Sequence, residues 1–279
     1  MTSPSWTEVA AGVFTRHFEP LELNVGLIVG SQECLIIDTG ADVQQGQQLA
    51  ALVREVTDLP WQVLNTHAHF DHCFGNGAFA DVPRWGQRGM VEWLRRYGTD
   101  HRRMIVRALL ATGMDDLAER VSRVSIVPPD HLVDERASID LGDRRVHFLY
   151  AGRGHSSHDL VVAVPDASLV FWGDLVEVGA DPEFDDGYPL EWAGTLSRLL
   201  DTVEVGMSRI AIPGHGDPAG RDQVEELHDR LDRLARHLVE ALERRPNRAR
   251  LVEELARTGF SSDTLEQVAA RVLPGRKHR

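Results

Sequence analysis

The eight residues from Asn65 to His72 constrain this chain more than any other stretch. They read NTHAHFDH, so three histidines and one aspartate stand within six positions. Imidazole and carboxylate groups are the side chains that bind Zn²⁺ and metals of similar softness. The alternative is a His-rich surface turn, and the segments before and after the motif decide between the two interpretations.

The setting of the motif favours a metal site. A short apolar run at residues 61–64 precedes it and is typical of a buried strand. Ligands at a strand end have a rigid base and still face a cleft. His67 and His69 are two positions apart, so in an extended loop they point to the same side, whereas the neighbours Asp71 and His72 diverge. This geometry suits two adjacent ions better than one.

Three later segments repeat the pattern of a strand followed by a glycine and a polar side chain. The predicted strands cover residues 145–150, 168–172 and 209–212, and they lead into Gly154-His155, Gly173-Asp174 and Gly214-His215. A single histidine after a glycine is usually a surface residue. Three such places in a chain that also carries the motif at 67–72 indicate one shared site.

On these residues the chain resembles the metallo-β-lactamase-fold hydrolases, over roughly residues 8 to 240. The matching pieces are Asp38-Thr39-Gly40, the motif at 67–72, Gly154-His155-Ser156, Gly173-Asp174 and Gly214-His215. The resemblance implies an α+β fold, an αββα sandwich with a two-metal cleft at one sheet edge. We expect residues 1–245 to form this domain, with a helical, lid-like insertion at about 84–123, and residues 246–279 to form a helical C-terminal tail.

The resemblance also implies a ligand set. It assigns the first metal to His67, His69 and His155, the second to Asp71, His72 and His215, and a bridging role to Asp174. Asp38 would support the ligand loop through hydrogen bonds, although a simple turn residue after a strand is the alternative. The expected cofactor is two Zn²⁺ per chain, with Fe or Mn as alternatives.

These ligands predict hydrolysis. Seven protein ligands leave open positions, and a hydroxide between two cations would be the nucleophile, because metal binding lowers the pKa of water to about 7. Asp71 is expected to orient this hydroxide and to take its proton. The predicted reaction is cleavage of an ester, thioester, lactone or amide bond in a small molecule. The alternatives are a mononuclear iron oxygenase similar to the persulfide dioxygenases, and a phosphodiesterase or nuclease on the same fold.

Composition limits the partners and the compartment. The net charge of −13 disfavours broad contact with nucleic acids. No stretch approaches the 18 apolar residues of a membrane span, and the start of the chain lacks the basic and apolar regions of a leader peptide. Two cysteines form no disulfide framework. We therefore expect a cytoplasmic protein that binds neither nucleic acid nor membrane.

Two segments are candidates for contact with the substrate. Residues 84–107 hold seven arginines against Glu92 and Asp100, either as a solvated helix face or as a lid that attracts an anionic substrate. The irregular loop at 181–192 follows Asp174 and offers aromatic side chains as pocket walls, with ordinary packing as the alternative. The candidate substrate-binding residues are His158, Phe184, Tyr188 and Trp192.

The remaining predictions concern the subfamily and assembly. Asp174 favours the group that is similar to glyoxalase II and the acyl-homoserine lactonases. The chain departs from the lactonases because Glu177 stands where their catalytic tyrosine does, and from glyoxalase II because no Gly-Cys-Gly-Arg segment follows Asp174. A leucine stripe over residues 224–242 predicts a helix that covers the sheet or, as the alternative, the seam of a homodimer.

Overall fold

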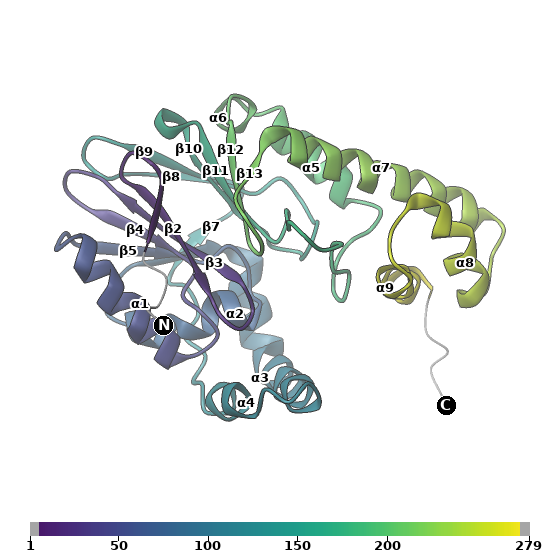
Figure 1. Cartoon of the computed structure of the whole chain (residues 1–279), viewed down its shortest axis with the longest axis horizontal. Helices are drawn as coiled ribbons and strands as arrows, with labels where there is room; N and C mark the ends of the chain where they lie inside the picture. The colour runs from purple at the N-terminus through teal and green to yellow at the C-terminus, as the bar shows by residue number, and fades with distance from the viewer. Residues whose placement is uncertain (1–5, 274–279) are drawn as a thin grey trace.

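The computed structural model of the chain describes residues 6–273 (Figure 1). The leader-peptide prediction depends on the first eight residues, of which 1–5 lie outside the described range. The predicted C-terminal tail also continues past this range, at residues 274–279. No helix among residues 6–273 is both long and apolar enough to cross a bilayer.

Two mixed β-sheets form the centre of the molecule. The first has seven strands in the order β1 to β7: Thr7–Ala10, Val13–Phe18, Leu23–Val29, Cys34–Ile37, Trp61–Leu64, Arg84–Gln87 and His131–Val133. The second has six strands in the order β13 to β8; from β8 to β13 they are Arg136–Asp140, Arg145–Leu149, Val161–Val164, Leu169–Gly173, Ile210–Pro213 and Ala219–Gly220. Strands that were predicted from apolar runs therefore lie in both sheets.

The facing sides of the two sheets enclose one apolar core. Side chains of the first sheet, such as Ile28 and Leu35, meet Phe148 and Phe171 of the second in a single buried cluster. The central strands β3, β4, β10 and β11 are buried almost throughout, because helices cover the other face of each sheet. Because both faces of these strands are buried, their sequences are largely apolar and do not alternate between apolar and polar residues.

Helices form the two outer layers. The α-helices, α1 to α9, are Val43–Val56, Phe70–Cys73, Arg88–Ala111, Asp115–Ser122, Trp192–Leu200, Val203–Gly206, Arg221–Glu243, Arg248–Leu255 and Ser262–Val272. Helix α1 buries Leu49 and Val53 against the first sheet, while α5 and α7 pack on the second. The order helix, sheet, sheet, helix confirms the αββα sandwich with C-terminal helices (Figure 1).

The leucine stripe of α7 belongs to the core of its own chain. Leu231, Leu234 and Leu238 are fully buried and share a cluster with the second sheet. The stripe therefore covers the sheet, which is the first of the two predicted interpretations. A homodimer stays a prediction. Helices α8 and α9 lie at the far end of α7 and add Leu251 and Val268 to the same cluster (Figure 1). The domain boundary at residue 245 stays a prediction.

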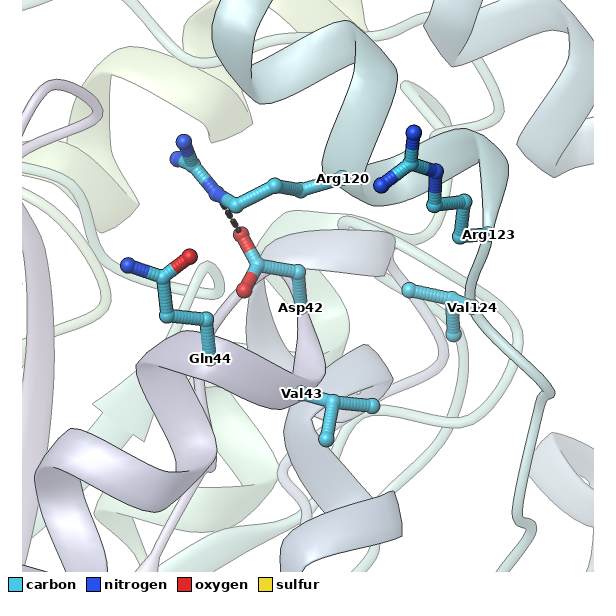
Figure 2. Close-up of a pocket in the computed structure, with 6 residues that line it drawn as sticks. All are labelled: Asp42, Val43, Gln44, Arg120, Arg123 and Val124. Carbon is cyan, nitrogen blue, oxygen red and sulfur yellow. Dashed lines mark hydrogen bonds and ion pairs between the residues drawn. The ribbon is translucent and has the colours of Figure 1, made fainter.

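The segment 84–123 is helical except at its start. Arg84–Gln87 forms strand β6, which pairs in parallel with β5, and α3 and α4 follow. Helix α4 is tied to the sandwich by Arg120, whose Nε donates to Oδ2 of Asp42 at 2.9 Å. Asp42 caps α1, so the ion pair joins two helices beside a small surface hollow (Figure 2). This hollow contains none of the predicted ligands.

Parallel pairing brings the ends of four strands to one edge of the sandwich. Strands β4 and β5 run parallel and in register to their last residues. In the second sheet β11 and β12 also pair in parallel to their last residues, with a register shift between Phe171 and Gly173. The two sheets are joined here, because the backbone N–H of Asn24 donates to the carbonyl of Gly214 at 2.8 Å. The segments that follow these strands carry Asp38, His67, Asp174 and His215.

Candidate metal centre

Seven side chains converge at this edge in two groups. Within each group the possible donor atoms lie within 4.8 Å of one another. The first group is His67, His69, His155 and Asp174, and the second is Asp71, His72 and His215. The structure thus brings together all seven residues that the sequence predicts as ligands.

Asp174 stands between the two groups. Its Oδ2 lies 3.4 Å from Nε2 of His67 and 3.4 Å from Nε2 of His155, and its Oδ1 lies 3.2 Å from Nε2 of His72. Among residues 6–273, no hydrogen bond satisfies the buried Nε2 of His67 or Oδ1 of Asp174. An unpaired buried polar atom costs about 1–3 kcal/mol, and a cation would supply the missing partner. The donor set therefore fits a pair of metal ions.

Two glycines permit this close approach. A Cβ atom at Gly214 would lie 1.8 Å from Oδ1 of Asp174, so no larger residue fits beside the carboxylate. Gly173 has a φ of +53°, and a Cβ there would lie 2.9 Å from Cβ of Thr66. The glycines that the sequence shows before Asp174 and His215 are thus required by packing as well as by backbone conformation.

Asp38 supports His72, a member of the second group, from outside the ligand set. Its carboxylate accepts hydrogen bonds from the backbone N and the Oγ1 of Thr66, and it pairs with Nδ1 of His72, each at 2.8 Å. Burial raises the pKa of Asp38, although its contacts with His72 and Thr66 oppose this shift. Because Nδ1 of His72 faces Asp38, its Nε2 faces Asp71 and Asp174. A carboxylate in this place fixes the orientation of a metal-binding imidazole.

His69 has a similar carboxylate partner. Its Nδ1 lies 3.0 Å from Nε2 of His155, and its Nε2 lies 3.2 Å from Oδ1 of Asp186. Burial favours the neutral ring, but the hydrogen bond with Asp186 raises the pKa of His69 to about 9. Burial lowers the pKa of His155 to about 4. A metal ion competes with these protons, because it binds only the deprotonated nitrogen.

The ligands face a cavity of about 650 Å³, a size typical of small-molecule sites. One wall is mostly apolar and comes largely from α2 and α3; its residues are Leu21, Phe70, Trp93, His101, Met104 and Ile105. A second, acidic set of lining residues consists of Glu177, Glu183, Asp185 and Asp186. None of the described residues that line this cavity is a lysine or an arginine.

Comparison with known proteins identifies the family. A profile of the Metallo-beta-lactamase superfamily matches residues 19–215, which span all seven candidate ligands. The chain belongs to the metallo-beta-lactamase superfamily. The match ends at His215, so α7, α8 and α9 lie beyond it.

Two curated relatives are each about a quarter identical to this chain. The probable metallo-hydrolase YqgX of Bacillus subtilis is 26% identical over 166 residues, which are 57% of this chain and 69% of that protein. The acyl-coenzyme A thioesterase MBLAC2 of Homo sapiens is 26% identical over 227 residues, 73% of this chain and 76% of that protein. Their names indicate hydrolase activity in a broad sense.

Solved structures agree on the fold. A crystal structure of a metallo-beta-lactamase from Erythrobacter litoralis superposes with a TM-score of 0.64 at 18% identity, covering 84% of this chain and 98% of that one. The mono-zinc form of the metallo-beta-lactamase FIM-1 from Pseudomonas aeruginosa gives a TM-score of 0.65 at 18% identity, covering 83% and 96%. At this identity the likeness establishes the fold alone.

The four predicted substrate-binding residues are not among the residues that line this cavity, and their contact with a substrate stays a prediction. Phe184 and Trp192 are fully buried in the core, with ring centroids 5.2 Å apart. The ring of Tyr188 contacts the guanidinium groups of Arg153 and Arg271. His158 is buried, and its Nδ1 lies 2.9 Å from Oγ of Ser156. The aromatic rings of the loop at 181–192 anchor it to the protein because burying them stabilises the fold.

None of the seven arginines at 84–107 lines the cavity. Arg84 pairs with Asp130, and Arg88 pairs with Asp134. Arg95 and Arg96 are exposed, and neither lines the cavity. Helix α3 does form a wall of the site, but through its other face.

Sequence reasoning missed His101 and the acidic wall. The residues of α3 that line the cavity are Trp93, His101, Met104 and Ile105. Their spacing of eight, three and one keeps them on one side of a helix, so the helical period could have grouped them. The acidic wall was visible as a run of carboxylates after Asp174, but only the structure shows that they face the ligands.

Proposed function

We propose that this protein is a dinuclear zinc hydrolase that cleaves an ester, thioester, lactone or amide bond of a small molecule. The observation that carries the proposal is the set of seven convergent ligands, with Asp174 between two groups that open into one cavity. The hydrolase names of two relatives, a probable metallo-hydrolase and a thioesterase, support it.

Each group of residues has a defined role in this proposal. His67, His69 and His155 would hold one Zn²⁺, the side chains of the second group would hold another, and Asp174 would contact both. Two Zn²⁺ ions bound there would lower the pKa of a water molecule and polarise the scissile carbonyl. Nitrogen and carboxylate donors suit Zn²⁺, and Asp38 and Asp186 would hold two of the imidazoles in orientation.

Asp71 is the residue that we propose to move the proton. It lines the cavity, and its Oδ2 lies 3.3 Å from Nε2 of His215. Burial favours the protonated acid, but the neighbouring His72 and His215 lower the pKa of Asp71 below its usual range. A carboxylate that stays ionised beside the cavity is able to accept a proton from water and to pass it to the leaving group.

The cavity walls suggest the substrate class. No arginine or lysine stands among the described residues that line the cavity, so no cationic side chain there would bind a substrate anion. Four acidic residues line it, although burial raises the pKa of Glu177 to about 8 and also raises the pKa of Glu183. We therefore propose a neutral or cationic substrate in place of the anionic one that the arginine-rich segment suggested. The wall formed by Trp93, Met104 and Ile105 would contact an apolar acyl or alkyl group. The same charges argue against nucleic acid as a substrate.

Hydrolysis of a matched substrate panel tests the proposal. The Zn²⁺-loaded protein would be assayed with p-nitrophenyl esters whose acyl groups carry a carboxylate, no charge or a trimethylammonium group, together with a thioester, a lactone and an amide. We expect turnover of at least one neutral or cationic substrate, its loss on chelation and its return with Zn²⁺. Turnover that chelation leaves unchanged, or no hydrolysis by fully loaded protein, would contradict the proposal.

A further inference from the structure

The loop of residues 181–188 connects the metal centre to the C-terminal helices. Its Asp186 pairs with Nε2 of His69, the nitrogen on the far side of the ring from the other ligands. We call these eight residues the Asp186 loop. Because the loop has no regular secondary structure, its position depends on the groups that bind its backbone.

Helix α9 supplies those groups. Oε1 of Gln267 accepts a hydrogen bond from the backbone N of Phe184 at 2.7 Å. Arg271 donates from Nε to the carbonyl of Gly187 and from Nη2 to the carbonyl of Asp186, each at 2.8 Å. Gln267 and Arg271 are four residues apart, so they lie on the same face of α9. Three hydrogen bonds from one helix face thus fix the loop on both sides of the Asp186 carboxylate.

The loop also contacts a second ligand segment. The backbone N of Tyr188 donates to the carbonyl of Gly154, next to His155, at 2.8 Å. The ring of Tyr188 contacts two guanidinium groups, with Arg153 at 4.5 Å and Arg271 at 5.4 Å from its centroid. At the other end of the loop, Asp181 accepts from Arg230 and from the backbone N of Ser261. The loop is therefore held between the C-terminal helices and the segment that carries His155.

We propose that helix α9 positions the first metal ligand group through the Asp186 loop. Gln267 and Arg271 hold the loop, and Asp186 accepts the Nε2–H of His69, so that Nδ1 faces His155 and the metal. This inference rests on the proposed function, because it concerns the same metal centre. It also gives a role to a segment outside the superfamily match, which ends at residue 215.

The expected effect follows from the chain of contacts. A carboxylate that fixes a metal-binding imidazole typically contributes about 10–100-fold to metal affinity. Removal of Asp186 should cost this full factor. Removal of Gln267 or Arg271 leaves the carboxylate present but less well placed, so the loss should be smaller, about 3–10-fold. These three are positioning residues, since they act on the metal through His69.

The experiment compares loop-binding variants with a matched arginine variant in the same tail. Asp186→Ala, Arg271→Ala and Gln267→Ala test the proposal, and Arg271→Lys should recover part of the effect because lysine still donates to a carbonyl. Arg248→Ala is the control, since Arg248 contacts the carboxylate and the carbonyl of Glu266 on α9 and not the loop. Gln267→Ala removes a single acceptor, so it remains informative if Arg271→Ala does not fold.

Two readouts are needed. Zn²⁺ affinity would be measured by competition with a chromophoric chelator. The Nε2–H proton of His69 would be observed by NMR in ¹⁵N-histidine-labelled, Zn²⁺-loaded protein. We expect the Zn²⁺ affinity to be highest in wild type and Arg248→Ala and lower in Arg271→Lys. It should be lower still in Arg271→Ala and Gln267→Ala, and lowest in Asp186→Ala. The slowly exchanging Nε2–H signal should be lost in Asp186→Ala and should exchange faster in Arg271→Ala.

The outcomes separate this inference from the proposed function. The inference would be overturned if the wild type binds Zn²⁺ and the loop-binding variants match Arg248→Ala in Zn²⁺ affinity and in the His69 signal. That result would leave the proposed function intact. Wild-type protein that binds no Zn²⁺ would overturn both.

Discussion

Replacing Gly214 by alanine is a sharp test of the packing that puts Asp174 between the two ligand groups. The new Cβ would lie 1.8 Å from Oδ1 of Asp174, whereas real contacts are essentially never shorter than 3.0 Å, so one group must move by the difference of about 1.2 Å. The backbone of Gly214 is held by Gly173 and Asn24, so the carboxylate is the part that must yield. Metal–ligand distances tolerate only about 0.2 Å, and a 1 Å misplacement costs about 100-fold in rate.

We therefore expect Gly214→Ala to lose at least one Zn²⁺ per chain and to lower kcat/KM by about 100-fold or more. The free energy of unfolding should fall by about 1–3 kcal/mol from overpacking. Metal content after gel filtration, circular dichroism and kcat/KM would be measured together. Gly194→Ala is the matched control, because a Cβ there meets only Nη1 of Arg198, at 3.3 Å. Full metal content and turnover in Gly214→Ala would refute the assignment of Asp174 as the bridge.

Three further perturbations give distinct results. Burial lowers the pKa of His158 to about 3, so in metal-free protein below pH 6.5 the unfolded chain takes up a proton that the folded chain does not. The unfolding free energy of the wild type should consequently fall more steeply as the pH is lowered from 6 to 4 than that of His158→Gln. The difference between the two slopes should be about 1.4 kcal/mol per pH unit, and equal slopes in denaturant titrations would contradict this. Arg95→Ala with Arg96→Ala should leave the ratio of KM values for anionic and neutral esters unchanged, because neither side chain lines the cavity, and a selective rise for the anionic ester would restore the arginine-lid hypothesis. Trp93→Ala should raise KM for long-chain acyl esters by about tenfold through lost apolar contact while Zn²⁺ content stays the same, and an equal rise for acetyl esters would argue against an acyl-binding wall.

The seven candidate ligands could be predicted from the sequence because their signals are local and resemble the motifs of a known family. Each ligand follows a short apolar strand, and a glycine precedes Asp174 and His215. Parallel strands end at a common edge, so ligands after several strands converge without further information. The spacing of apolar residues predicted individual strands and helices. The αββα sandwich itself was implied by the resemblance to the metallo-β-lactamase-fold hydrolases.

The walls of the cavity could not be predicted in this way. Phe184 and Trp192 are aromatic residues of the kind that often line pockets, yet both are buried in the core. The direction of a loop side chain depends on what packs against the loop, which the sequence does not show. Arg95 and Trp93 stand on one helix, and sequence alone does not show which face meets the metal centre. Arg271 contacts Asp186, which lies 85 positions earlier in a loop without regular secondary structure. No periodic pattern in the sequence predicts such a contact.

The metal content of protein purified without added metal tests the central claim most directly. The two ligand groups predict close to two Zn²⁺ per chain, measured by inductively coupled plasma mass spectrometry, with loss of hydrolysis on chelation. A stoichiometry of one iron per chain, together with oxygen uptake, would contradict the dinuclear hydrolase and favour the mononuclear iron oxygenase.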